Sequence, residues 1–467
     1  MTFEKRNTVR EKLRTGKFCI FLEYAVPATT QDLKLALAPG MEMAKYAGAE
    51  ERVTALIVGP GPPVGSRPDI YDVAGHIRNV CATESVVAVT GHNGDIDSLR
   101  KTVAGLDSLG VTSVLALTGD VDPDHPRDKR GVPVYRPNAY LDSCRMIRII
   151  RANCPEMTVG AAVNPFKYNV ADNFLQYFKM IRKLNTGADF ISTQAGWDMK
   201  KYQELQWFLR SRSISEPVVA RLMMVSPDEV TGIVGHQRAG LVMSHELGAL
   251  IQRESALNEK QAMSAQIRRL SLQAAGCKLF GYSGIQIAGL PDAKTAKAVV
   301  KRITESLDGI DSYESWLNEW NDFHNRIEMA PYPDRYYVFK DLMTPEYPDY
   351  DPDAVRQTDT SLPEPTRGDK IRYNLARALH LQKFDNPPVN LLKGPLCGYR
   401  KGRDWNLERT FNVCAAGCPK GLEDGPCGGS LPDGTCEFGH QACIFHKIIA
   451  LADWQNKLEM LEEPYED

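Results

Sequence analysis

The feature that most constrains the fold is an alternation of short apolar runs with helical patterns, repeated eight times between residues 19 and 307. The run VTSVLALTGD (111–120) is typical, because it lacks the polar alternation of a half-exposed strand and ends in small residues and a carboxylate. The other runs lie at 19–27, 52–58, 86–93, 157–165, 189–194, 217–224 and 284–291. This count favours an α/β fold with a (β/α)₈ TIM barrel over an open doubly wound sheet. No G-x-G-x-x-G turn follows the first run, which argues against a Rossmann dinucleotide site.

The composition changes after the eighth helical pattern. Residues 309–372 are rich in Tyr, Pro, Asp and Trp and have no clear period, so they predict a wrapping linker that docks through its aromatic side chains. A short helix then precedes a cysteine-rich segment, and another helix closes the chain. We therefore expect a barrel at 1–308, a linker at 309–372 and a small cysteine-rich metal-binding domain at 373–467.

Charge and hydropathy exclude some classes of partner. The formal net charge of −3 argues against a general nucleic-acid surface, while 43% hydrophobic residues suffice for a large core. No apolar run is long enough to span a bilayer, and the charged first 17 residues lack the apolar core of a signal peptide. We expect a cytoplasmic protein, forming a homo-oligomer, with no membrane or nucleic-acid partner.

The carboxyl ends of the predicted strands carry polar residues, and in a parallel barrel these ends form the rim that carries the chemistry. Glu23 is the most unusual of them, because a carboxylate inside an otherwise apolar strand is costly to bury. In a dry site its pKa should rise, which suits a general acid. The alternative is an exposed glutamate at a strand end.

Further rim candidates follow other strands. Asp120 either takes part in the chemistry or caps the next helix. Gln194 and Asn164 offer amide donors and acceptors suited to a flat heterocycle, and we expect Thr193 beside them in substrate binding, although either amide alone is more often structural. His92 is better interpreted as a loop histidine with no role.

The eleven cysteines are unevenly placed: five are scattered from Cys19 to Cys277, and six fall between Cys397 and Cys443. In a cytosolic chain such a cluster indicates metal binding before disulfides. Four thiolates can build a closed structural zinc site, although an iron–sulfur cluster also uses four cysteines and unligated buried cysteines are the third alternative. The candidate ligands form the pattern Cys414-x3-Cys418-x8-Cys427-x8-Cys436-x6-Cys443.

Several of these motifs resemble a known family. FLEYAVPATT, ALTGD, the NPF after the fifth strand, KLNTGADFISTQ and GYSGIQIAGLPD resemble methylenetetrahydrofolate reductases, over about residues 18–307. The C-terminal CPKGLEDGPCGGSLPDGTCEFGHQACIFHK resembles the zinc-binding domain or small partner subunit found with acetogen-type reductases. The resemblance implies a TIM barrel that binds flavin at the strand C-termini and acts on a tetrahydrofolate.

The resemblance also implies roles for four residues. Glu23 matches the folate-side general acid of the family's FEF-type motif. Asp120 matches the aspartate of the ALRGD-type motif, near flavin and pterin, and Gln194 matches the pterin-contacting glutamine of the ITQ motif. Lys183 matches the lysine of the KVDAGA-type motif, a flavin-phosphate contact, where the alternative is an ordinary surface lysine.

The departures from the family pattern fall on the flavin side. Ala88 stands in place of the strand-three histidine, and Thr118, on the cofactor side, in place of the ALRGD arginine. The tyrosine after strand five aligns near Val163, and an acidic residue one helix later aligns with Gln176. Either FAD, FMN or no flavin is therefore compatible with the sequence. The family's early cysteine cluster is reduced to Cys397.

The resemblance leads to a first hypothesis and two alternatives. We expect an oxidoreductase that interconverts 5,10-methylenetetrahydrofolate and 5-methyltetrahydrofolate, with an electron-transfer protein as a possible partner. The first alternative is a flavin-independent tetrahydrofolate methyltransferase that exchanges a methyl group with a corrinoid protein or another donor. The second is a barrel without catalytic activity, serving as a scaffold or an electron-transfer partner.

Overall fold

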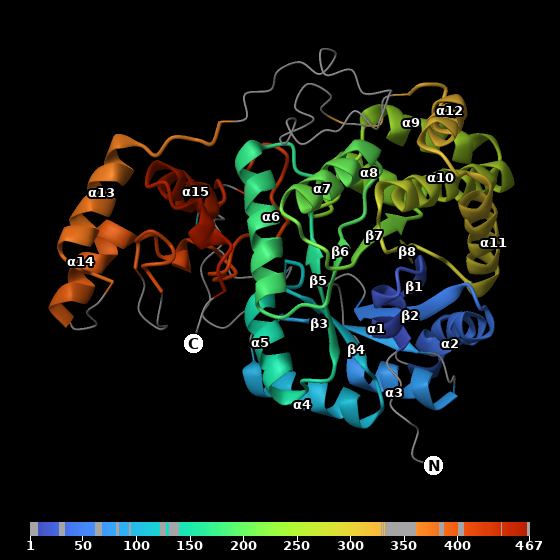
Figure 1. Cartoon of the computed structure of the whole chain (residues 1–467), viewed down its shortest axis with the longest axis horizontal. Coiled ribbons are helices and arrows are strands. Elements are labelled where there is room, and N and C mark those ends of the chain that lie inside the picture. The colour runs from blue at the N-terminus through green and yellow to red at the C-terminus, as the bar shows by residue number, and fades with distance from the viewer. Residues whose placement is uncertain are drawn as a thin grey trace.

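The computed structural model of the chain describes residues 8–27, 33–60, 68–80, 84–92, 95–121, 128–129, 140–327, 329, 331, 361–382, 387–399, 406–439 and 441–464. Within them, eight parallel strands close into a barrel in chain order, which confirms the expected TIM barrel (Figure 1). The strands are β1 (Cys19–Val26), β2 (Val53–Pro60), β3 (Ser85–Thr90), β4 (Ser113–Leu117), β5 (Thr158–Val163), β6 (Phe190–Thr193), β7 (Val218–Met223) and β8 (Gly284–Ala288).

Helices join successive strands and cover the outside of the barrel. Several begin at a side chain that accepts a hydrogen bond from the first turn, as Asp142 does before α5 and Asn169 before α6. Three helices, α8 to α10, lie between β7 and β8. The helices of the barrel are α1 (Thr8–Arg14), α2 (Leu33–Ala49), α3 (Ile70–Val80), α4 (Ile96–Ser108), α5 (Ser143–Asn153), α6 (Val170–Asn185), α7 (Met199–Ser211), α8 (Pro227–Val234), α9 (His245–Leu257), α10 (Glu259–Phe280) and α11 (Ala293–Gly309).

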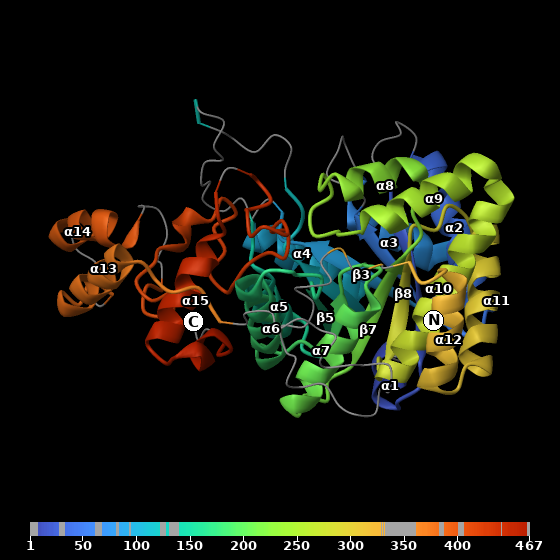
Figure 2. The same cartoon turned by 90° about the horizontal axis from the view of Figure 1, so that it is seen from above.

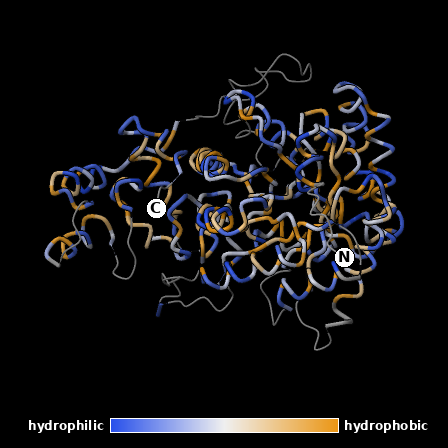
Figure 3. The backbone as a smooth tube through the Cα atoms, turned by 60° about the horizontal axis from the view of Figure 1, so that its bottom comes forward, coloured by the Kyte–Doolittle hydropathy of each residue, from blue (hydrophilic) through white to orange (hydrophobic). Residues whose placement is uncertain are grey.

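The barrel interior is a packed apolar core, separate from the larger core between strands and helices. It is closed at the amino-terminal end by Val9 and Leu13 of α1. Gly160 of β5 makes room for the ring of Phe190, since a Cβ at Gly160 would lie 2.3 Å from it. Hydrophobic segments accordingly run through the middle of the barrel in Figure 3. The strands contribute Cys19, Phe21, Ala55, Ile57, Val86, Ala88, Leu115, Phe190 and Val219 to this core.

The segment expected to be a linker contains a helix that the sequence analysis missed, α12 (Tyr313–Phe323). Trp316 of α12 is buried and donates a hydrogen bond from Nε1 to the carbonyl of Leu272 in α10, at 2.7 Å. The stretch 332–360 of that expected linker lies outside the described residues. Further on, α13 (Arg367–Ala378) covers part of the short helix that we expected, and α14 (Pro387–Cys397) is additional.

The cysteine-rich region lies on the α6 side of the barrel (Figures 1 and 2). It ends in α15 (Ile444–Trp454), which packs beside α6. Leu175 and Phe178 of α6 share one hydrophobic core with Phe445 and Ile448 of α15. This shared core helps to hold the cysteine-rich region against the barrel. None of the helices in the described part of the chain combines the length and apolar character that a bilayer span requires.

Candidate active site at the mouth of the barrel

A carboxylate and a guanidinium meet at the carboxyl end of the barrel interior. Glu23 lies two residues beyond Phe21 on β1, so it points to the same interior face. Arg221 of β7 binds it with two parallel hydrogen bonds, Nε to Oε2 and Nη2 to Oε1, each of 2.7 Å. Gln286 of β8 donates a third, from Nε2 to Oε2, at 2.6 Å. The side chain of Glu23 is only 11% exposed and that of Arg221 25%.

This pairing corrects the expected ionisation of Glu23. Burial alone would raise the pKa of its carboxyl group, but the charge of Arg221 and the hydrogen bonds from Arg221 and Gln286 outweigh burial and lower that pKa. Glu23 is therefore an anion, rather than a neutral acid, while it is paired. The sequence analysis missed Arg221, although a cation inside the apolar run PVVARLMM is as unusual as a carboxylate in the first strand.

Side chains of β6 and the residue after it extend this network. Gln194 accepts a hydrogen bond on Oε1 from Arg221 Nη1, at 2.8 Å. Ser192 donates from Oγ to Gln286 Oε1, also at 2.8 Å. Thr193, by contrast, accepts on Oγ1 the backbone N–H of Arg221, so it positions β7. We call the set Glu23, Ser192, Gln194, Arg221 and Gln286 the polar floor of the barrel mouth.

Asp120 lies near this floor, at the turn that follows β4. Gly119 has a φ of +93°, a left-handed conformation that only glycine adopts without strain. Asp120 itself is exposed, whereas Thr118 is buried. Burial alone would lower the pKa of the Arg221 guanidinium, but Glu23 and, more weakly, Asp120 raise it above its usual value. Asp120 therefore belongs to the electrostatic surroundings of the polar floor.

Two polar residues at the end of β5 bind the cysteine-rich region instead. Asn164 donates from Nδ2 to the carbonyls of Gly240, at 3.0 Å, and Gly428, at 2.8 Å. Lys167, which is 2% exposed, donates to the carbonyl of Ser430 at 2.6 Å. Asn164 is thus buried at the joint between the two regions, and its amide lies near that of Gln194 in the polar floor, since a Cβ on Gly240 would be 3.1 Å from Asn164 Nδ2 and 3.2 Å from Gln194 Nε2.

Lys183 also lies apart from the polar floor. It is buried between α6 and β5 and donates from Nζ to the carbonyl of Ala162, at 2.5 Å. Burial, assisted by the charge of neighbouring Lys179, lowers its pKa to about 8. It is therefore neither the surface lysine of the alternative interpretation nor a neighbour of Glu23. His92, for its part, forms a strand bridge and an edge-on ring contact with Tyr140.

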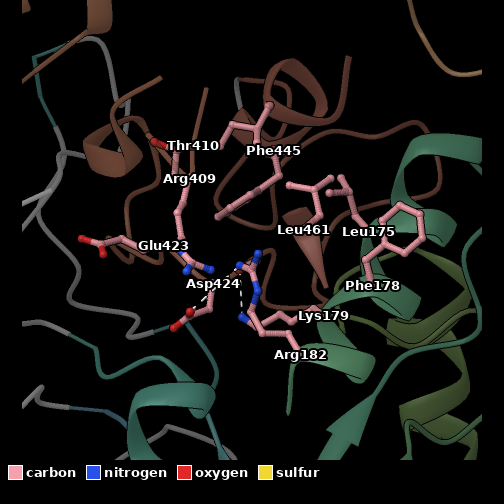
Figure 4. Close-up of a pocket in the computed structure, with 12 residues that line it drawn as sticks. Leu175, Phe178, Lys179, Arg182, Arg409, Thr410, Glu423, Asp424, Phe445 and Leu461 are labelled. Carbon is pink, nitrogen blue, oxygen red and sulfur yellow. Dashed lines mark hydrogen bonds and ion pairs between the residues drawn. The ribbon is translucent and has the colours of Figure 1, made fainter. Parts of the chain in front are cut away.

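A buried ionic cluster joins α6 to the cysteine-rich region (Figure 4). Lys179 binds Asp142 at 2.9 Å and donates to the carbonyl of Gly425 at 2.8 Å. Asp142, Cys144 and Asp424 offer ligand atoms within 4.8 Å of one another. A metal ion there would have to displace the Lys179 ammonium, so we interpret the cluster as an ionic joint.

Cys418, Cys427, Cys436 and Cys443 all pack against the hydrophobic core that α6 shares with α15. Backbone N–H groups two residues further on bond to the sulfurs of Cys418, Cys436 and Cys443, as in turns that wrap a metal-bound thiolate. Burial and, less strongly, Cys418 and Glu437 raise the pKa of Cys436 to about 12. Among these described cysteines, no three sulfurs lie within 4.8 Å of one another, so a bound metal would have to draw them together.

Cys414, the fifth expected ligand, belongs elsewhere. It is buried in a separate small core with Cys397, and its N–H donates to the carbonyl of that residue at 2.7 Å. Burial and, secondly, the nearby Cys414 raise the pKa of Cys397 to about 11. The structure therefore separates the sequence pattern into a group of four and a pair.

Comparisons with known proteins cover both regions. Residues 8–232 match the family described as methylenetetrahydrofolate reductase, and residues 393–467 match the family described as methylene-tetrahydrofolate reductase C terminal. A probable methylenetetrahydrofolate reductase (NADH) of Oryza sativa subsp. japonica is 25% identical over 232 residues, which cover 47% of this chain and 37% of the relative. Methylenetetrahydrofolate reductase (NADH) 1 of Arabidopsis thaliana is 28% identical over 176 residues, covering 35% and 28%. The chain thus spans about a third of the length of these curated relatives.

One solved structure is also similar. It is an uncharacterized protein from Clostridium thermocellum that is described as binding two copies of 5-methyl-5,6,7,8-tetrahydrofolic acid. The sequences are 11% identical, the TM-score is 0.47, and the match covers 63% of this chain and 98% of that one.

Proposed function

We propose, from the methylenetetrahydrofolate reductase family domain that residues 8–232 carry, that the chain interconverts 5,10-methylenetetrahydrofolate and 5-methyltetrahydrofolate at the barrel mouth, with a reduced flavin or nicotinamide as the hydride donor. The observation that supports this proposal most directly is the polar floor, with Asp120 beside it. A pterin is flat and carries hydrogen-bond donors and acceptors along its edge. Amide groups and a paired carboxylate at the bottom of a barrel mouth are suited to bind such an edge.

The charges at the mouth suggest how the chain assists the reaction. Opening of the methylene bridge places positive charge on the folate, and two carboxylates, Glu23 and Asp120, would stabilise that charge. Asp120 is exposed, so its carboxylate lies open to a ligand at the mouth. Glu23 would serve as a general acid only when the substrate separates it from Arg221, since the pairing lowers its pKa.

The residues that the resemblance assigns to flavin do not fit a flavin site. Lys183 is engaged with the backbone of β5, and Thr118 is buried without the charge of the family's arginine. Gly428 of the cysteine-rich region lies against Gln176, since a Cβ on Gly428 would be 3.2 Å from its Oε1. The cysteine-rich region thus covers Gln176, a position on the flavin side of the family pattern. This contact favours a second candidate, the flavin-independent methyltransferase that exchanges a methyl group with a corrinoid protein or another donor.

The four-cysteine group completes the proposal. We assign Cys418, Cys427, Cys436 and Cys443 as ligands of a zinc ion. The ion would be structural, because the protein would then supply all four ligands of a tetrahedral site. When bound, zinc would cross-link the turns of this region, and it would take no part in the reaction.

Calorimetric titration of the purified chain with FAD, FMN and 5-methyltetrahydrofolate, each separately, tests the function. We expect folate to bind, and the two flavin titrations decide between the reductase and the methyltransferase. Stoichiometric, tightly held flavin would overturn the covering argument and favour the reductase, whereas folate binding without flavin would favour methyl transfer. Failure to bind any tetrahydrofolate would contradict the proposed function.

A further inference from the structure

The cysteine-rich region places a cation, Lys420, at the barrel mouth. Lys420 donates from Nζ to the carbonyl of Gly119, at 2.8 Å. Gly119 is the residue just before Asp120. The same ammonium is paired with Glu437 at 2.6 Å, and both side chains are almost fully buried, at 2% and 3% exposure. It also lies over the ring of Tyr140, 5.1 Å from the centroid. Lys420 is therefore held in one place by three different groups.

The turn that Lys420 binds is one whose conformation matters. Gly119 adopts a left-handed φ of +93°, and this conformation sets the direction in which the chain leaves β4 and presents Asp120. A charge-assisted hydrogen bond to the Gly119 carbonyl fixes the orientation of the peptide unit between Gly119 and Asp120. The charge of Asp120 in turn acts on both Lys420 and Arg221.

The position of Lys420 depends on the four-cysteine group. It lies two residues after Cys418, and the backbone N–H groups of Lys420 and Leu422 both bond to the sulfur of Cys418. Its partner Glu437 directly follows Cys436, and Glu437 Oε1 lies 2.7 Å from Cys427 Sγ. The same turns that arrange the thiols thus orient the ammonium.

We propose that Lys420 is a positioning residue through which the cysteine-rich region fixes the Gly119–Asp120 turn and thereby sets the folate affinity of the barrel mouth. The part about affinity rests on the proposed function, whereas the part about the turn does not. Lys420 acts through Asp120 and does not itself bind folate.

A first experiment measures amide hydrogen exchange in the full chain, in peptides that contain Gly119 and Asp120. We expect Lys420→Met to speed exchange there about tenfold and Lys420→Arg to restore it, because arginine keeps a donor with positive charge. Lys167→Met is the matched control, since Lys167 is also a buried lysine that donates to a backbone carbonyl across the same joint. Unchanged exchange in Lys420→Met, or an equal change in Lys167→Met, would overturn the proposal.

Removing Lys420 leaves Glu437 buried without its counter-charge, which could unfold the region. The double variant Lys420→Met/Glu437→Gln removes both charges, and we expect it to show the same faster exchange at Gly119 and Asp120 with the cysteine-rich region still folded. Normal exchange in a folded double variant would contradict the proposal as directly as a normal single variant.

A second experiment is a double-mutant cycle on the affinity for 5-methyltetrahydrofolate. We expect Lys420→Met to weaken binding about tenfold in the wild-type background and to have no further effect in Asp120→Asn. Equal effects in both backgrounds would show that Lys420 acts by another route and would overturn the claim about affinity. If the wild-type chain binds no tetrahydrofolate, the proposed function fails, and the exchange experiment still decides the role of Lys420.

Discussion

At the scale of single residues, the pairing of Glu23 with Arg221 determines what the barrel mouth can do. A buried carboxylate without a partner would hold a proton, but two hydrogen bonds of 2.7 Å to a guanidinium keep this one ionised. The site therefore presents a fixed negative charge next to a fixed positive one. Such a pair can recognise a polar ring and also respond when a substrate competes for either member.

Glu23→Gln tests the importance of this charge. We expect the fold to persist and turnover to fall by about 10²–10⁴-fold, the usual range for loss of an acid or base. Steady-state kinetics with a folate substrate measures the effect. Glu84→Gln is a suitable control, because Glu84 lies before β3 and bonds to the N–H of Val9 at the closed end of the barrel. Wild-type turnover in Glu23→Gln would rule out a catalytic role for Glu23.

Arg221→Gln should change the pH dependence of kcat/KM. Without Arg221, burial remains as the largest influence on Glu23 and raises its pKa, so the acid limb of the pH–rate profile should move to higher pH. The kcat/KM profile of the variant measures the shift, with Arg210→Gln on the exposed outside of α7 as control. An acid limb that stays in place would mean that Glu23 does not control that limb.

At the scale of elements, the strands could be predicted because each is a continuous apolar run, a signal that lies entirely within the run. Helices α12 and α14 were missed because their sequences carry Trp, Asn or Pro residues that obscure a helical period. The partners of Glu23 were missed for a different reason. Arg221 and Gln286 come from β7 and β8, and only closure of the barrel brings them to β1.

Gly160→Ala tests the packing of the barrel interior. The new methyl group would lie about 2.3 Å from the Phe190 ring, so we expect a loss of roughly 1–3 kcal/mol in unfolding free energy. Urea denaturation measures it, and Gly160→Ala/Phe190→Leu should recover part of the loss. Gly75→Ala in α3 is the control, because its Cβ would meet Leu109 at an ordinary 3.5 Å. A loss no larger than that of the control would contradict this account of the core.

The joint between α6 and the cysteine-rich region should be sensitive to pH. Burial, and then the charge of Asp142, raises the pKa of Asp424 to about 6, although Arg182, Arg148 and Lys179 oppose the rise. A raised pKa in the folded state means that stability falls as pH rises from about 4 through about 6. We expect Asp424→Asn to remove that fall, as measured by thermal unfolding between pH 4.5 and 7.5. Parallel stability–pH profiles for the wild-type protein and Asp424→Asn would show that Asp424 does not cause the fall in stability.

At the scale of the whole molecule, two regions of the chain contribute to one rim. The place of the cysteine-rich region along the sequence could be predicted from the spacing of its cysteines, but its contacts with the barrel could not. The bonds from Asn164 to Gly428 and from Lys420 to Gly119 join residues 264 and 301 positions apart. No local pattern marks such pairs, and the same is true of the separation of Cys414 from the other four cysteines.

Metal analysis of the full chain tests the zinc proposal. We expect about one zinc ion per chain, lost in Cys427→Ser and retained in Cys414→Ser, because Cys414 packs with Cys397 instead. Iron with acid-labile sulfide, accompanied by broad absorption near roughly 400 nm, would show that the site holds an iron–sulfur centre rather than zinc. Loss of metal in both variants would return Cys414 to the ligand set.

The bond between Lys420 and Gly119 has a consequence for how the protein is made. A ribosome adds about 5–20 residues per second, so at least about 15 s pass between the synthesis of Gly119 and that of Lys420. All eight strands have been synthesised well before then, since β8 ends at Ala288. A nascent barrel can therefore close while its mouth still lacks the residue that fixes Asp120. The last step in maturation of the mouth is then the folding of the cysteine-rich region.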